Sequence, residues 1–166
     1  MISRMTSYIC SGRLIPALVL LGLASWHSSL AQSSPALSIA PSGQVTIKRG
    51  GEAELKLKAE VRQGFHVNSN APNDEFLIPL KLTWPMGPVE AEQVNYPKPQ
   101  FEHYAFSANP VSVFSGNFEI VTRFKAAVGA MPGPAGITGK LRFQACNEKE
   151  CLPPRTIDVR VTLDVQ

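Results

Sequence analysis

The sequence of 166 residues is 44% hydrophobic and 17% charged, and its formal net charge at pH 7 is +3. A chain of this length can bury a substantial core within one domain. The small net charge gives no basis for a nucleic-acid-binding or membrane-surface protein, and three cysteines are too few for a disulfide-dense miniature scaffold.

The first 31 residues are predicted to be a secretory signal peptide. Arg4 and Arg13 precede an apolar run from Leu14 to Ala24, and Ser29-Leu30-Ala31 supplies a small-x-small cleavage site. The run of about 11 residues is shorter than the roughly 20 that a membrane-spanning helix needs, which leaves an uncleaved anchor as the alternative. We therefore expect an exported protein of residues 32–166, whose net charge falls from +3 to +1 because the two arginines are removed.

The remaining chain alternates strand patterns with turns. The clearest pattern runs from Glu52 to Val61, where the odd-numbered residues are apolar and the even-numbered residues are charged. A period of two with one apolar face predicts a half-buried strand. Comparable patterns predict an edge strand near Leu37 and Ile39 and then strands at Gln44–Lys48, Phe65–Asn70, Phe76–Trp84, Val89–Tyr96, Val111–Phe114, Phe118–Ala126, Ile137–Cys146 and Thr156–Val165.

Two features interrupt this order. Pro79 lacks the N–H that a central ladder needs, so the strand Phe76–Trp84 is predicted to lie at a sheet edge or to carry a bulge. Residues 129–136, rich in Gly and Pro, are predicted to form a surface loop. With about eight strands and no amphipathic helix, residues 32–166 are predicted to form a single all-β sandwich domain.

The segment Phe101–Pro110 fits neither a strand nor a helix period, yet it contains Phe101, Tyr104 and Phe106. An aromatic segment without a period of its own must pack on, or cover, another part of the molecule. Glu102, in the same segment, could tune a thiol, but it is interpreted as a solvated charge.

Cys10 lies within the predicted signal peptide, so Cys146 and Cys151 are the only cysteines of the mature chain. A turn can bring their Cα atoms to the separation of about 5.5 Å that suits a disulfide. Strand alternation places Cys146 on the polar face of its strand, pointing away from the core. A structural disulfide that closes so short a loop contributes roughly 2 kcal/mol, against about 4 to 5 for a loop of a hundred residues. Spacing alone leaves a structural disulfide and a redox-active pair both open.

No metal site is predicted. Zinc normally takes four ligands, and besides the two thiols the mature chain offers only His66 and His103, which are distant in sequence. Both histidines are interpreted as structural residues rather than proton acceptors. No helix start follows Cys146, and two glutamates oppose the nearby Lys149, so the sequence shows no obviously activated thiol.

Three segments together carry a resemblance to a known family. They are Gly64-Phe65-His66-Val67-Asn68-Ser69, Phe76 to Trp84, and Leu141 to Cys146 followed by Cys151-Leu152-Pro153-Pro154. The mature chain resembles, over essentially its whole length, the N-terminal periplasmic domain of the transmembrane thiol:disulfide interchange protein (DsbD family). The most specific part is the pattern Phe-Gln-Ala-Cys-x4-Cys-Leu-Pro-Pro.

The resemblance implies an immunoglobulin-like β-sandwich in the periplasm. It implies a thiol:disulfide oxidoreductase of the protein-disulfide reductase type, linked to cytochrome c biogenesis. Cys146 and Cys151 would be the catalytic pair, and Cys151 would form the mixed disulfide with the partner. The family's shielding loop corresponds in position to Phe101–Pro110. Its cap residues would be Phe101, Glu102, Tyr104 and Phe106, with Phe106 as the covering side chain and Tyr104 next.

This sequence differs from the family in two ways. The best-known enteric member has five residues between its cysteines, whereas this sequence has four. The membrane-embedded carrier and the thioredoxin domain of the full protein are not in this sequence. We therefore expect electrons from a thioredoxin-like protein or a membrane-embedded thiol reductase on another chain, with no small-molecule cofactor and no nucleic-acid partner. The alternative is a secreted immunoglobulin-like binding module with a purely structural disulfide.

Overall fold

The computed structural model describes residues 34–41 and 43–166, so the predicted signal peptide at residues 1–31 lies outside the described part of the chain. All regular secondary structure in the described residues is β-strand. This confirms the predicted all-β fold. Over the same residues, no helix has the length and apolar character needed to cross a membrane.

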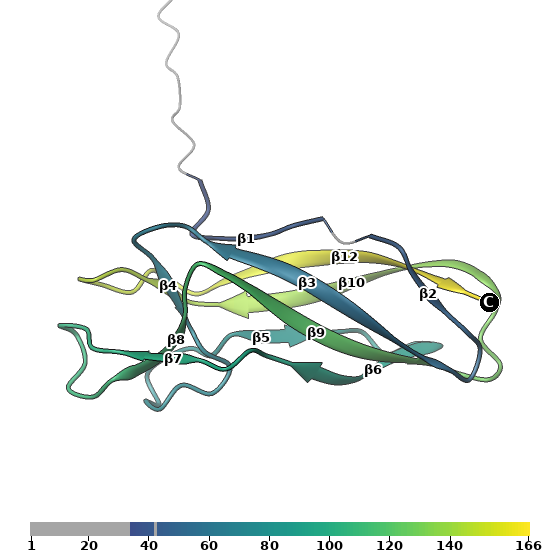
Figure 1. The fold of residues 1–166 in the computed structure, drawn as a ribbon, viewed down its shortest axis with the longest axis horizontal. Helices are drawn as coiled ribbons and strands as arrows, with labels where there is room; N and C mark the ends of the chain where they lie inside the picture. The colour runs from purple at the N-terminus through teal and green to yellow at the C-terminus, as the bar shows by residue number, and fades with distance from the viewer. Residues whose placement is uncertain (1–33, 42) are drawn as a thin grey trace, which may run out of the picture. The chain divides into compact units, whose positions relative to one another are not determined.

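Two four-stranded sheets form the long layers of a sandwich (Figure 1). The first sheet has the antiparallel order β1 (Leu37–Ile39), β3 (Glu52–Val61), β9 (Asn117–Ala126) and β6 (Val89–Asn95). The second has the order β2 (Val45–Ile47), β12 (Arg155–Val165), β10 (Gly133–Phe143) and β5 (Lys81–Thr83), with β2 and β12 parallel. The apolar faces of both sheets contribute to one hydrophobic core.

A small third sheet lies at one end of the described residues. Its antiparallel order is β11 (Ala145–Cys146), β4 (His66–Asn68), β8 (Val111–Phe114) and β7 (Gln100–Glu102). Figure 1 shows β4, β7 and β8 together at the left, at the opposite end from the C-terminus. This sheet joins the cysteine segment to the aromatic segment, although the two are distant in sequence.

The strand count of about eight is wrong, since the described residues form twelve strands. Part of the difference comes from the predicted strand Ile137–Cys146, which divides at Gln144. Residues up to Phe143 pair with β12, whereas Ala145 and Cys146 pair with β4. The change of partner splits one predicted strand into two. Part of the aromatic segment is also a strand, because Gln100–Glu102 pairs with β8.

Two further boundaries differ from prediction. The loop predicted at 129–136 is wrong in its second half, because Gly133 already begins β10 and pairs with Val165 of β12. The ladder to β12 outweighs the local Gly and Pro composition, and Pro134 is tolerated because β5 pairs only with residues 140–142 on the other side. The predicted strand at 76–84 is shorter than expected, but β5 does lie at a sheet edge.

Trp84 links the two long layers directly after β5. Its indole Nε1 donates a hydrogen bond to Thr122 Oγ1 at 3.1 Å, and its ring meets Phe124 edge-on with centroids 5.1 Å apart. Gly139 on β10 lies beneath the indole. A Cβ atom at this position would lie 2.7 Å from Trp84 Cε3, closer than carbon atoms can approach. The absence of a side chain at Gly139 is therefore a condition for this packing.

We expect Gly139→Ala to lower the free energy of unfolding by about 1–3 kcal/mol, because the added methyl group overpacks the indole. Urea denaturation followed by tryptophan fluorescence measures the change. Gly136→Ala is the matched control on the same strand, since a Cβ atom there meets nothing within 4 Å. Equal stability of the two variants would contradict this account of Gly139.

Candidate functional site

The two cysteines form a disulfide that closes a tight hairpin after β10. The Cα atoms of Cys146 and Cys151 are 3.9 Å apart, and the two residues also form an antiparallel β-bridge. Asn147 organises the turn between them, because its Oδ1 accepts hydrogen bonds from the backbone N–H groups of Lys149 at 2.8 Å and Glu150 at 2.9 Å. Such side-chain-to-backbone bonds are the reason that Asn favours turns. The side chain of Asn147 thus stabilises the turn that brings the two cysteines together.

The two sulfur-bearing residues differ in exposure. Cys146 is fully buried (0% exposed), whereas Cys151 is partly exposed. In β11, Ala145 belongs to the core cluster, so the alternation of side chains directs Cys146 to the opposite face. Cys146 was expected on the polar face of its strand, but other residues cover it completely. A partner approaching from solvent meets Cys151 first.

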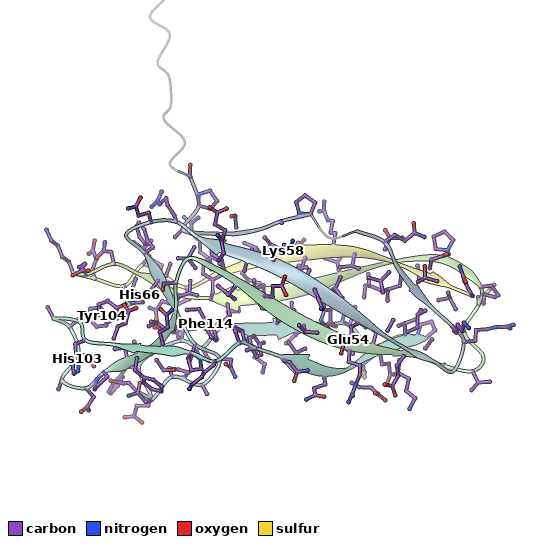
Figure 2. All side chains as sticks on the ribbon, in the orientation of Figure 1. Glu54, Lys58, His66, His103, Tyr104 and Phe114 are labelled. Carbon is purple, nitrogen blue, oxygen red and sulfur yellow. A yellow bond between two sulfur atoms is a disulfide. The ribbon has the colours of Figure 1, made fainter. Side chains whose placement is uncertain are left out.

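His66 stands directly beside the disulfide in the small sheet. It is the Cα partner of Cys146 in the antiparallel pair of β4 and β11, and Cys146 is in turn the bridge partner of Cys151. Directly opposed residues of antiparallel strands present their side chains on the same face, with Cβ atoms about 5 Å apart. His66, Cys146 and Cys151 thus form one row across three segments. His103, in contrast, is exposed and lies apart from this row (Figure 2).

The rings of Tyr104 and Phe106 form a stacked cluster with His66 of this row. Tyr104 stacks on His66 with centroids 4.0 Å apart and an interplanar angle of 20°. Phe106 lies 5.3 Å from Tyr104 and 6.2 Å from His66. Figure 2 shows His66 and Tyr104 next to each other at the end that carries the small sheet. Tyr104 thus makes a closer contact with the cysteine row's histidine than Phe106 does, and Phe101, which is 63% exposed, does not join the cluster.

A hydrogen bond orders the cap segment (Phe101–Pro110) internally, and charge connects this segment to the cysteine hairpin. The hydroxyl group of Tyr104 donates to the carboxylate of Glu102, which is therefore not the freely solvated charge that the sequence suggested. Burial, followed by the bond to Glu102, raises the pKa of Tyr104 well above its usual value, and the charge of Glu148 adds to the shift. Glu148 belongs to the cysteine hairpin. The hairpin and the cap segment are therefore close enough for their charges to interact.

A protein-family comparison identifies residues 36–163 as "Thiol:disulfide interchange protein DsbD, N-terminal". The chain belongs to the DsbD N-terminal domain family. The match includes strands β1 to β11, β12 as far as Leu163, the whole cap segment and both cysteines. No curated protein has a matching sequence.

Solved structures similar to this member of the DsbD N-terminal family include the N-terminal periplasmic domain of ScsB from Proteus mirabilis. It has 12% sequence identity and a TM-score of 0.51, over 75% of this chain and 43% of the ScsB chain. The Neisseria meningitidis DsbD N-terminal domain in the reduced form has 15% identity and a TM-score of 0.46, over 77% and 82% of the two chains. This chain spans less than half of the ScsB chain, and at such identities the likeness concerns the fold alone. The immunoglobulin-like sandwich expected from the sequence is confirmed.

An amide network, which the sequence analysis missed, holds the base of the hairpin in this DsbD-family domain. Gln144 was expected on a polar strand face, but its Nε2 donates to the carbonyl oxygen of Leu152, just after Cys151, at 3.3 Å. Its Oε1 accepts from Asn68 Nδ2 at 3.1 Å and from the backbone N–H of Ile78 at 3.2 Å. Asn68 is fully buried. In the sequence, Gln144 stands between the apolar residues Phe143 and Ala145, which could have indicated a buried amide. Strand alternation had instead placed its side chain toward solvent.

Removal of the Tyr104 ring is expected to open access to the disulfide. In Tyr104→Ala, the stack on His66 and the bond to Glu102 are both lost. We expect dithiothreitol to reduce the Cys146–Cys151 bond several times faster in this variant, as measured by thiol titration over time. Phe101→Ala is the control, because the Phe101 ring is already largely exposed and makes no ring contact in the described residues. Similar reduction rates in the two variants would show that Tyr104 does not shield the pair.

Proposed function

We propose that this domain is an exported thiol:disulfide oxidoreductase that relays electrons between a thioredoxin-like donor and disulfide-bonded partner proteins. The observation that carries the proposal is the arrangement of the Cys146–Cys151 disulfide, with one buried and one accessible cysteine next to His66, on which Tyr104 stacks. Membership of the DsbD N-terminal family supports thiol:disulfide interchange as the chemistry. A periplasmic location is supported by the predicted signal peptide and by the periplasmic ScsB domain of similar fold.

The exposure of the two cysteines supports distinct roles in the exchange. In the dithiol form, the Cys151 thiolate attacks a disulfide of the partner, which forms a mixed disulfide and releases one partner thiolate. The Cys146 thiolate then attacks the sulfur of Cys151, which closes the Cys146–Cys151 bond and releases the second partner thiolate. Two electrons and, overall, two protons pass to the partner. A thioredoxin-like dithiol restores the reduced pair by the same steps in reverse.

The cap segment is proposed to gate this exchange. Tyr104 and Phe106 stack with His66 of the cysteine row, and the bond from Tyr104 to Glu102 holds the Tyr104 ring in place. Docking of a partner would displace these rings and uncover Cys151. Phe101, on the exposed side of β7, would border the opening rather than cover the pair.

We expect the equilibrium reduction potential of the pair to lie at roughly −200 to −260 mV, within the range of known exchange proteins. Equilibration of the purified protein with glutathione buffers, and then with dithiothreitol buffers, measures the value. A bond that stays oxidised below about −300 mV would instead identify a structural disulfide. The secreted binding module with a structural disulfide would then be the favoured function.

The roles of the two cysteines predict which variant traps a partner. Cys146→Ser retains the accessible Cys151 and lacks the resolving thiol, so a mixed disulfide with a thioredoxin-like protein should accumulate. Cys151→Ser is the matched control and should accumulate little, because Cys146 is buried. Non-reducing electrophoresis and mass spectrometry identify the adduct. Preferential trapping by Cys151→Ser would reverse the assignment.

A further inference from the structure

His66 is a buried polar side chain whose hydrogen bonding is incomplete. The residue is 3% exposed, and its Nε2 atom has no hydrogen-bond partner among the described residues. Buried nitrogen atoms without a partner are uncommon, because losing the bond to water costs free energy. The row that His66 shares with Cys146 and Cys151 suggests which group could meet this nitrogen. A disulfide sulfur carries no proton to donate, whereas the thiol of reduced Cys146 does.

The exchange chemistry requires such a partner at Cys146. The attacking species is a thiolate, so the Cys146 thiol must lose its proton before it can resolve the mixed disulfide. Cys146 is fully buried, and burial in apolar surroundings disfavours the thiolate. His66 and Cys146 are both buried, and the ring of Tyr104 stacks on His66, so water has little access to the Cys146 thiol. The proton therefore needs an acceptor within the protein.

We propose that His66 is the proton acceptor for Cys146 in the resolving step. This proposal rests on the proposed interchange function. Neutral His66 takes the proton of the Cys146 thiol at Nε2, and the resulting Cys146 thiolate attacks the sulfur of Cys151 in the mixed disulfide. The Cys146–Cys151 bond forms, the bond from Cys151 to the partner breaks, and the partner leaves as a thiolate. The imidazolium then returns its proton to the departing thiolate or to water.

The groups around His66 keep the imidazole suited to this role. Burial lowers the pKa of His66 below its usual 6.5, and the charge of Glu102 from the cap segment opposes this shift. A lowered pKa means that the imidazole is neutral, and hence able to accept a proton, at pH 7. Tyr104 stacks on the ring as a neutral phenol, because its own pKa is raised. The charge of Glu148, in the hairpin, also raises the pKa of Tyr104. The stacking, the burial and the cross-strand position of His66 thus all favour a neutral imidazole beside Cys146.

The test separates the two steps of the exchange. Reduced protein is mixed with one equivalent of 5,5′-dithiobis(2-nitrobenzoate), and stopped-flow absorbance follows release of the two thionitrobenzoate ions between pH 5 and 9. The first release reports attack by Cys151, and the second reports resolution by Cys146. The variant is His66→Phe, which keeps a flat ring against Tyr104 and removes both nitrogen atoms. His66→Gln is a second variant that keeps polarity without a base, and His103→Gln is the control at an exposed histidine.

We expect the second phase of the unmodified protein to follow a group that titrates below pH 6.5 and to level off above it. Both His66 variants should slow this phase about a hundredfold at pH 7, the low end of general-base effects. In both His66 variants, the rate of the second phase should rise with pH up to pH 9. The first phase of these variants, and both phases of His103→Gln, should have the same rates as in the unmodified protein.

Unchanged rate and pH profile of the second phase in His66→Phe and His66→Gln would overturn the role of His66 and leave the interchange function standing. No thionitrobenzoate release from the unmodified reduced protein would overturn both, because neither thiol could then exchange.

Discussion

The antiparallel pairing of β11 with β4 is the contact on which the site depends. It places His66 opposite Cys146, and the bridge to Cys151 extends the row by one segment. The same small sheet continues through β8 to β7, which carries the start of the cap segment. Two loops that are distant in sequence are thereby held at one end of the sandwich. A change in this register by one residue would turn the cysteine and the histidine to opposite faces.

The site combines burial with limited access. The backbone reversal at Asn147 and the amide network of Gln144 hold the hairpin, while Tyr104 stacks on His66, the neighbour of Cys146 in the small sheet. In the proposed exchange, the partly exposed Cys151 receives the partner, and the buried Cys146 beside a neutral imidazole resolves the mixed disulfide. Because Tyr104 and Phe106 lie in a loop and outside the core cluster, the proposed gating would displace them without loss of the sandwich.

Several features followed from local pattern alone. The strict alternation of Glu52–Val61 matches β3 residue for residue, because one face of that strand meets the core and the other meets water. The pairing of the cysteines was within reach of the sequence, since four residues allow a turn. Two predicted strand boundaries were wrong. At Gly133, pairing with β12 outweighs the local Gly and Pro composition, and at Gln144 the predicted strand changes its partner from β12 to β4.

The sequence by itself determined the all-β class, the cysteine pair and the family, because alternation and motif spacing are local properties. Only the tertiary structure decided that His66 rather than His103 stands beside Cys146, that Tyr104 makes the closer contact with it, and that Gln144 is a structural clamp. Each of these contacts joins segments that are far apart along the chain. Their proximity depends on the register between strands and on the packing of the layers, which no local pattern records.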